Sequence, residues 1–276
     1  MGWYMFKNNF VHGQNIKNKK VKSNYPPILD EIDLKYEDWK RKTERLNSEH
    51  PEELAEKVRL LNEYYDYMET VAHYFKAQDK LESSIIEEFL VYLLRDIPDL
   101  KENLNGGLLF MGQSRVYLDL SFAPQNLSDF ITNPGIYINK KDQDFTIFKK
   151  VNCIFENNKN REEIELIVPA VVVECKTYIP KTMFDQAAYE AQRLKEGNPF
   201  ALYIILAQQN ALRDDVNLKN TKVDEIFILR KQKRSKKKKP IDASVVSDFY
   251  SFIKDYLRKD WFDNRGATER GRLIRT

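Results

Sequence analysis

The chain has 276 residues, of which 42% are hydrophobic and 32% are charged, and its formal net charge at pH 7 is only +3. This length and hydrophobic content allow a large buried core, so we expect one or two globular domains and exclude a small binding module. The two cysteines, Cys153 and Cys175, exclude a disulfide framework, and their spacing does not fit a zinc site.

The amino end carries no recognisable export signal, because its aromatic stretch over residues 1–10 is interrupted by Lys7 and Asn8. No apolar run elsewhere is long enough to span a bilayer. We therefore expect a cytoplasmic protein with no membrane partner.

Two charged helices are predicted near the amino end, over residues 28–47 and 51–76, and Pro51 suits the first turn of the second one. Apolar side chains recur at helical spacing in that second helix, at Leu54, Val58, Leu61, Tyr65 and Met68. We assign residues 1–76 to an N-terminal helical subdomain.

The next two predicted elements are a helix and a half-buried strand. The helix over residues 81–94 has apolar side chains at helical spacing and carries Glu87 and Glu88 in its middle. The strand over residues 114–122 alternates between apolar and polar side chains, and Asp119 falls on its polar face.

A β-hairpin is predicted after this strand. Residues 136–140 and 145–155 have strand character, and they flank the polar segment Lys141-Asp142-Gln143-Asp144. We interpret this segment as the turn of the hairpin.

An almost unbroken apolar run over residues 164–173 predicts a strand buried on both faces, which should end in water. Glu174 and Lys176 follow it directly and project from the same face, opposite Val173 and Cys175. Charged side chains are rarely buried without partners, so this pair requires a cleft, a metal ion or an ion-pair network.

A strand-helix-strand crossover is predicted next. Residues 181–195 form the helix, Asn198-Pro199 ends it, and residues 200–207 form a second apolar strand. A last helix is predicted up to Lys259, with Asp242 as its N-cap.

Basic side chains crowd into residues 231–239, just before Pro240. We expect a mobile loop whose lysines contact phosphate groups. Two further basic segments lie at residues 15–22 and at Arg265, Arg270, Arg272 and Arg275, an arrangement that suits a protein surrounding DNA.

The chemistry that these residues allow is metal-dependent hydrolysis. Asp119 could meet Glu174 across the sheet, and two carboxylates are enough to hold Mg²⁺. Lys176 would orient or deprotonate the attacking water, with a pKa lowered by burial or by the metal. The alternatives to Asp119 as the first acid are Asp142, Asp144, Glu156 and Glu165.

Asp119 with Glu174-Cys175-Lys176 resembles the active-site motif of the PD-(D/E)XK nuclease superfamily. The resemblance implies an α/β fold over residues 77–230, with a mixed central sheet flanked by helices in the order αβββαβ. It further implies Mg²⁺ held by Asp119 and Glu174, with Lys176 as the catalytic lysine. The 55 positions between the two acids are a wider spacing than the superfamily usually shows.

More narrowly, the chain is similar to subunits of BbvCI-type restriction endonucleases, which are assembled from two related chains. The similarity covers residues 80–276 and is carried by the segments 84–90, 174–177, 225–232 and 271–275 and by the strand around Asp119. It implies a site-specific endonuclease that acts on double-stranded DNA with a second subunit, either a copy or a related chain. It also favours Glu88 over Glu87 as the helix acid near the metal. Residues 231–276 would then add a basic tract and a helix to the catalytic core.

Other interpretations remain open at this point. The chain could be a repair or recombination nuclease of the same fold, or a DNA-binding protein in which Glu174 and Lys176 form a structural ion pair. The bases that the protein reads cannot be assigned, and the candidate arginines are Arg115, Arg193, Arg213 and Arg230.

Overall fold

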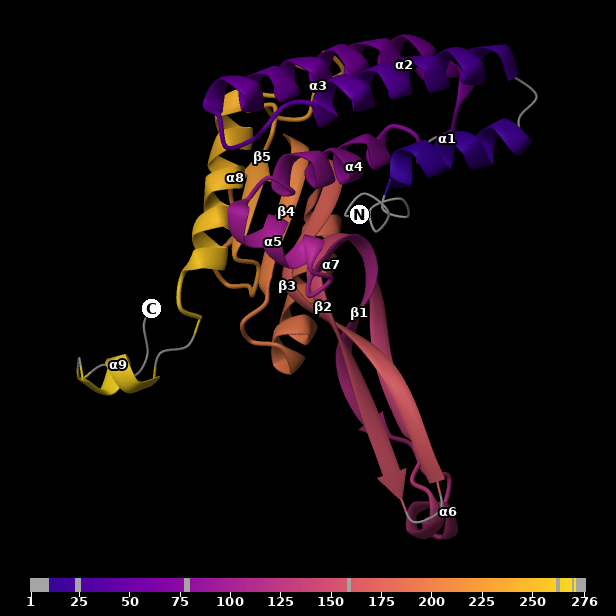
Figure 1. The fold of residues 1–276 in the computed structure, drawn as a ribbon, viewed down its shortest axis with the longest axis vertical. Helices are drawn as coiled ribbons and strands as arrows, with labels where there is room; N and C mark the ends of the chain where they lie inside the picture. Colours follow the sequence, from indigo (N-terminus) through magenta and orange to yellow (C-terminus); the bar gives the residue numbers. More distant parts are fainter. Residues whose placement is uncertain are drawn as a thin grey trace.

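The computed structural model describes residues 10–22, 26–76, 80–157, 160–261, 264–269 and 271 (Figure 1). Its elements in chain order are α1 (Val11–Lys22), α2 (Pro26–Glu44), α3 (Pro51–Val71), η2 (Ala72–Tyr74), α4 (Ser83–Leu94), α5 (Pro98–Asn105), β1 (Phe110–Phe122), α6 (Leu127–Thr132), β2 (Ile136–Asn157), β3 (Asn160–Ile179), α7 (Lys181–Gly197), β4 (Leu202–Asn210), β5 (Glu225–Ile228), α8 (Ala243–Arg258) and α9 (Asn264–Glu269).

The five strands form one mixed sheet in the order β1-β2-β3-β4-β5. The pairs β1–β2 and β2–β3 are antiparallel, whereas β3–β4 and β4–β5 are parallel. The predicted α/β core is confirmed, because α4, β1, β2, β3, α7 and β4 follow one another in the αβββαβ order.

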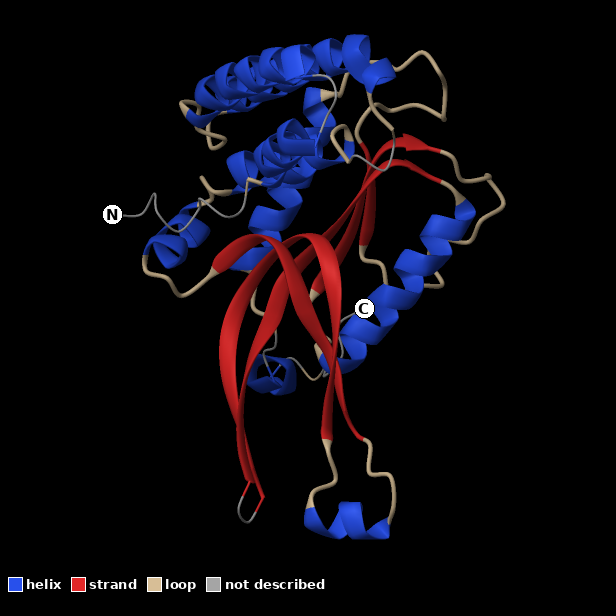
Figure 2. Ribbon diagram, turned by 90° about the vertical axis from the view of Figure 1, so that its right-hand side faces the viewer, coloured by secondary structure: helices blue, strands red, loops and turns tan. Residues whose placement is uncertain are grey.

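Strand β2 changes its pairing partner along its length. Its first part pairs with β1 from Ile136 to Phe148, and its second part pairs with β3 from Phe145 to Asn157. Two antiparallel fingers therefore leave the sheet, as Figure 2 shows. We call residues 114–143 the first finger, which ends in α6, and residues 149–168 the second finger.

The predicted hairpin turn at residues 141–144 is wrong, because β2 runs through it without interruption. Two of the polar side chains of this segment lie in surroundings that the local sequence does not show. Gln143 is buried opposite Ser114, and Asp144 accepts a hydrogen bond from the backbone N–H of Cys175. Strand β3 also extends beyond Glu174 and Lys176, since its pairing with β4 continues to Ile179.

The sheet is covered on both faces. Helices α1 to α5 and α8 share one hydrophobic core with Val171, Val173 and Cys175 of β3. Helix α7 packs on the opposite face, in a second core that contains Val172 and Ile205 (Figure 2). The predicted alternation of β3 is therefore confirmed, and the N-terminal helices share a continuous core with the sheet.

The predicted helices are found with small shifts of their ends. The apolar side chains predicted for the second helix are buried in α3, and Asp242 caps α8 by accepting hydrogen bonds from the backbone N–H groups of Ser244 and Val245 at 2.8 and 3.4 Å. None of the helices in the described part of the chain is long and apolar enough to cross a bilayer.

Gly197 lets the end of α7 approach the first finger closely. A Cβ atom at this position would lie 2.1 Å from the carbonyl oxygen of Leu118. Because this neighbour is backbone, Gly197→Ala should force the helix away from β1 and lower the free energy of unfolding by about 1–3 kcal/mol. Thermal unfolding of the variant tests this, with Gly106→Ala as the control, since its nearest atom lies at 3.5 Å. Equal melting temperatures for the two variants would contradict it.

Candidate active site

Glu174 and Lys176 lie where β2 and β3 separate, and we call this point the fork. Beyond the pair Phe145↔Val173, β2 leaves β3, so the following part of β3 faces the base of the first finger. Lys176 donates a hydrogen bond to Glu174, and the two side chains are only 25% and 14% exposed. The pair therefore stands in a partly closed site between diverging strands.

Asp144 completes this pair from the neighbouring strand. It precedes Phe145, so it faces Glu174 where the strands separate. Its Oδ2 atom lies 2.9 Å from the backbone nitrogen of Cys175 and 3.5 Å from Nζ of Lys176. The backbone hydrogen bond fixes the carboxylate beside the lysine.

The structure does not bring Asp119 to this site. Asp119 pairs with Asn139, five residues along β2 from Asp144, which corresponds to roughly 17 Å along the strand. Its carboxylate accepts hydrogen bonds from Asn139 and Arg193, and these lower its pKa. Asp119 thus joins the first finger to α7, and Asp144, one of the alternatives to it, meets Glu174 instead.

Glu87 and Glu88, the two acids of α4, lie in different surroundings. Glu88 is fully buried against the N-terminal helices, where it accepts hydrogen bonds from the backbone of His12 and Gly13 at 2.9 and 3.1 Å and from the hydroxyls of Tyr36 and Tyr92. It holds α1 and α2 against α4. The structure therefore does not place Glu88 near Glu174.

Glu87 faces the candidate site. Burial, followed by the negative charge of Asp144, raises its pKa to about 8, while Gln113 and the charge of Lys176 act in the opposite direction. Gln113 donates a hydrogen bond to Glu87 at 2.7 Å. This glutamine sits at a register shift of β1, next to Gly112 at a φ of 125°, which only glycine adopts readily.

Helix α7 adds a further acid. Glu190 is buried, and it accepts hydrogen bonds from Lys141 of β2 at 2.8 Å and from Gln186 at 3.0 Å. Its negative charge contributes to the raised pKa of Glu174. Neither Glu190 nor Lys141 was identified from the sequence. Helical spacing from Gln186 was the one available signal, because residues four positions apart share a helix face.

At the fork, two carboxylates, Asp144 and Glu174, lie near one lysine, Lys176. Burial and then the charge of Asp144 raise the pKa of Glu174, despite the nearby Lys176. Burial lowers the pKa of Lys176, but the charges of Asp144 and Glu174 outweigh it, so this pKa is raised. The expected lowering of the lysine pKa is therefore wrong for the protein without metal, where Lys176 is an ammonium group at neutral pH.

A divalent cation fits this excess of carboxylates. Within the described ranges, no group of three or more His, Cys, Asp or Glu side chains is placed to hold a metal ion. Mg²⁺ does not need such a set, because it keeps several waters and commonly uses one or two carboxylates together with a substrate phosphate. Asp144 and Glu174 supply those two carboxylates, and a cation between them would relieve their repulsion.

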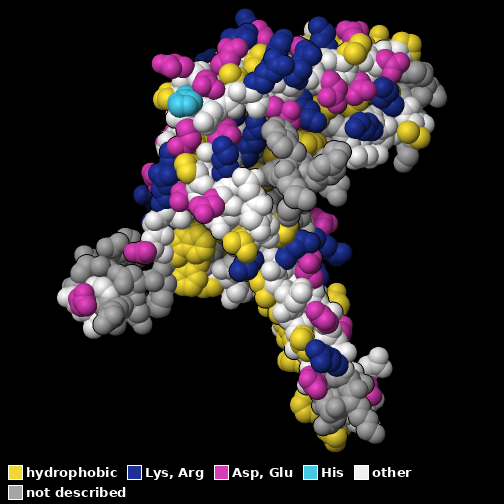
Figure 3. Space-filling model, viewed as in Figure 1, with side chains coloured by type: hydrophobic (Ala, Val, Ile, Leu, Met, Phe, Trp, Pro, Cys, Tyr) yellow, Lys and Arg dark blue, Asp and Glu magenta, His cyan; other side chains and the backbone are white. Residues whose placement is uncertain are grey.

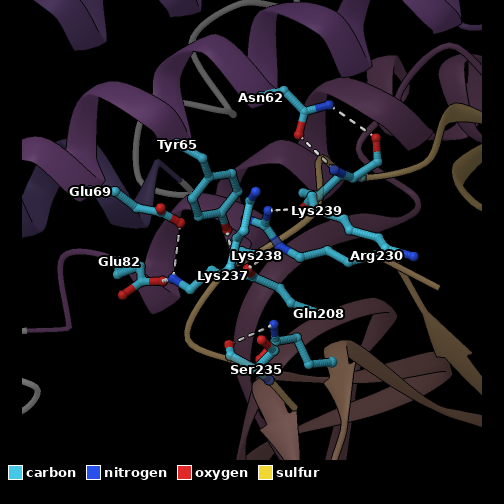
Figure 4. A network of polar contacts seen from close by, with 12 residues as sticks. Asn62, Tyr65, Glu69, Glu82, Gln208, Arg230, Ser235, Lys237, Lys238 and Lys239 are labelled. Atoms are coloured by element: carbon cyan, nitrogen blue, oxygen red, sulfur yellow. Dashed lines mark hydrogen bonds and ion pairs between the residues drawn. The ribbon is translucent and has the colours of Figure 1, made fainter. Parts of the chain in front are cut away.

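The basic tract at residues 231–239 was expected to be a mobile loop, but in the structure Lys238 ties it to α3 and to the residue before α4 (Figure 4). Lys238 forms ion pairs with Glu82 and Glu69 at 2.5 and 3.1 Å. Arg230, immediately before the tract, is only 3% exposed and donates to Gln208 at 3.0 Å, which excludes it as a reader of bases in this structure. The acids that hold the tract come from distant segments, so the tract itself gave no sign of them.

Of the other predicted nucleic-acid contacts, Arg115 and Arg213 are 68% and 80% exposed, and Arg193 is engaged with Asp119. Residues 15–22 lie in α1. Arg270, Arg272 and Arg275 and the side chain of Arg265 lie outside the described residues.

Arg234 brings one positive charge of the tract next to the fork. Its guanidinium lies 3.7 Å from the ring centroid of Tyr178, which follows Lys176 by two residues on β3 and so shares its face. If DNA occupies the fork, Arg234→Ala should reduce the salt dependence of DNA binding, measured as log K against log[salt], by about 0.9. Lys238→Ala is the matched control and should leave the slope unchanged, because its charge is already paired. The same slope for both variants would contradict this role.

Comparisons with known proteins agree with this fold. A family model described as Bpu10I restriction endonuclease matches residues 78–239, which is more than half of the chain. Among solved structures, a chain of the native BbvCI A2B2 tetramer, determined at low resolution, superimposes with a TM-score of 0.72 at 18% sequence identity. The match covers 92% of this chain and 98% of that chain. No curated protein sequence matches the chain.

Proposed function

Because the chain belongs to the Bpu10I restriction endonuclease family, we propose that it is a subunit of a type II enzyme that hydrolyses phosphodiester bonds in duplex DNA at a specific sequence. The observation that carries this proposal is the convergence of Asp144 and Glu174, from adjacent strands, on Lys176 at the fork of the sheet. The side chain of Lys176 remains 25% exposed at this point, so a phosphate of the DNA backbone could reach it.

Asp144 and Glu174 would hold the Mg²⁺ ion in this proposal. Bound there, the ion would polarise the scissile phosphate and lower the pKa of an attacking water. Asp144 replaces Asp119 in this role, whereas Glu174 and Lys176 keep the roles predicted from the sequence. The hydrogen bond from the backbone of Cys175 keeps the Asp144 carboxylate in position before any ligand arrives.

Lys176 acts as a cation in this arrangement. Its raised pKa keeps the ammonium group protonated at neutral pH, so it can donate hydrogen bonds to a water or to a phosphate oxygen. It would orient the water and offset the negative charge that develops on the phosphate. Removing a proton from the water would need another acceptor, or a lysine pKa lowered by the bound substrate complex.

Glu87 takes the place of Glu88 as the helix acid of the site. The charges of both Asp144 and Lys176 affect its pKa, and a hydrogen bond from Gln113 fixes its orientation. With a pKa of about 8, Glu87 is mostly protonated at neutral pH, and a nearby cation would favour its ionised form. Glu87 is thus suited to hold a water ligand of the metal, in either protonation state.

A second subunit is needed to cut both strands, because one chain supplies one such site. The solved structure with the similar fold is described as an A2B2 tetramer. We propose that this chain also works in an assembly, with its partner being a copy or a related chain of the same fold.

Incubation of the purified chain with supercoiled plasmids of varied sequence, with and without Mg²⁺, tests the proposal. We expect Mg²⁺-dependent nicking or linearisation at a defined sequence, by the chain alone or together with a related partner chain. Cleavage at defined sites that persists in the presence of excess EDTA would contradict the metal-dependent mechanism. Cleavage without sequence preference would contradict the assignment as a restriction enzyme.

A further inference from the structure

Lys141 brings a second lysine to the fork, three residues before Asp144 on β2. In the register of β1 and β2 it lies opposite Val116, which belongs to the core beneath α7. Residues directly opposite each other in an antiparallel pair share a face of the sheet, so Lys141 also points towards α7. Its Nζ atom lies 2.8 Å from Oε1 of Glu190 on that helix.

Glu174 and Lys176 project from the same face of the sheet. They alternate along β3 with Val173, which lies in the core on the other side. The pKa of Lys141 is raised first by its hydrogen bond to Glu190 and also by the charge of Glu174, against the effect of burial. Lys141 and Lys176 thus border one group of carboxylates.

Lys141 is the most exposed charged side chain of this group. It is 39% exposed, compared with 25% for Lys176 and with 29%, 14% and 10% for Asp144, Glu174 and Glu190. An ammonium group has three donor hydrogens, and the contact with Glu190 engages one of them. In Figure 3, lysine or arginine side chains lie among acids where the fingers leave the body of the protein.

A DNA phosphate that reaches Lys176 meets an excess of negative charge. Asp144, Glu174 and Glu190 are three carboxylates, and the charge of Lys176 alone does not balance them. Phosphate groups are bound largely by basic side chains, and lysine supplies a compact charge on a flexible stem. Lys141 is therefore suited to accept a phosphate at the outer side of the fork.

We propose that Lys141 binds a phosphate group of the DNA substrate, next to the one that Lys176 contacts, and that Glu190 holds its ammonium group at the fork until DNA arrives. This proposal rests on the proposed function and assigns a second phosphate contact to the same site. The alternative is that the ion pair only braces β2 against α7, as Asp119 and Arg193 brace β1 against it. The two roles give Glu190 opposite effects on DNA binding.

The affinity of the purified full chain for duplex DNA separates the two roles, measured by fluorescence anisotropy with EDTA to prevent cleavage. Glu190→Gln should strengthen binding by at least about threefold, because it removes a negative charge beside the phosphate and still accepts a hydrogen bond from Lys141. Adding Lys141→Gln to this variant should weaken binding by about tenfold at about 50 mM salt. The double variant leaves no carboxylate buried at position 190 without its partner.

Two controls accompany these variants. Lys141→Arg keeps the positive charge and should bind DNA within about twofold of the wild type. Lys150 on the second finger is 41% exposed and pairs with Glu165 at 3.0 Å, so it matches Lys141 in exposure and in having one acidic partner. Lys150→Gln should change the affinity by less than about twofold. Thermal unfolding shows that each variant is folded.

Equal affinities of Glu190→Gln and the double variant would overturn the proposal. Weaker binding by folded Glu190→Gln than by the wild type would also overturn it, because the ion pair would then act as a brace. An equal loss in Lys150→Gln would do the same, since the effect would not be specific to the fork. Plasmid cleavage with Mg²⁺ is measured on the same samples, and the expected affinities without any cleavage would count against the proposed function alone.

Discussion

Asp144→Asn is expected to slow DNA cleavage by at least about 1,000-fold, whereas Asp119→Asn should keep the rate within about threefold of the wild type. Asp144 shares Lys176 and the fork with Glu174, so its neutralisation removes half of the charge that would hold Mg²⁺. Asp119 is engaged with Asn139 and Arg193 at the side of the first finger. The measurement is the single-turnover rate on plasmid DNA at saturating Mg²⁺, with whichever partner subunit the enzyme needs.

The reverse ranking of the two asparagine variants would contradict the assignment of Asp144. Asp119→Asn also serves as a matched control for folding, because both substitutions remove one negative charge from β1 or β2. Its expected cost in stability is within about 1 kcal/mol, since the carboxylate of Asp119 is 37% exposed and its ion pair is screened by solvent. Circular dichroism of both variants would show whether the loss of activity is specific.

Glu87→Gln is expected to stabilise the metal-free protein, and increasingly so as the pH rises. The pKa of Glu87 is raised to about 8, so the folded protein keeps a proton that the unfolded chain releases near the ordinary pKa of 4.5. The favourable contribution of the protonated group is complete below about pH 4.5 and is lost as the pH rises towards 8. At pH 9 the variant should therefore be more stable than the wild type by about 2–4 kcal/mol, and near pH 4 the two should be equal.

Urea unfolding at several pH values between 4 and 9, in the presence of EDTA, measures this difference. Glu63→Gln on α3 is the control for the loss of one carboxylate, because Glu63 is 60% exposed. It should show a small difference from the wild type that does not grow with pH. A constant separation between the Glu87→Gln and wild-type curves across the whole range would contradict the buried, proton-binding position of Glu87.

The placement of Glu174 and Lys176 followed from local sequence, whereas the identity of their partner acid did not. An apolar run of ten residues defines a strand, and strict alternation then decides which side chains share a face. The acid that lies next to Glu174 depends on the register of β1, β2 and β3 relative to one another. Residues that are distant from Glu174 in the sequence set this register. The wide spacing of 55 positions to Asp119 was the available warning, and Asp144 lies only 30 positions from Glu174.

The change of pairing partner along β2 could not be predicted from the residues of β2 itself. Lys141 to Asp144 have the composition of a turn, but Gln143 is buried and Asp144 is bonded to the backbone of β3. Helix α4 posed a similar difficulty, because nearly all its side chains are buried and it has no polar face. Which of Glu87 and Glu88 faces the sheet depends on how the N-terminal helices pack against it.

Binding of Mn²⁺, used as a paramagnetic substitute for Mg²⁺, tests the central claim most directly, because it requires neither the recognition sequence nor a partner subunit. We expect electron paramagnetic resonance titrations to detect one site per chain in the wild type and in Asp119→Asn. Asp144→Asn and Glu174→Gln should each weaken binding at this site by at least about tenfold. Unchanged binding in Asp144→Asn, together with loss of binding in Asp119→Asn, would contradict the metal site at the fork.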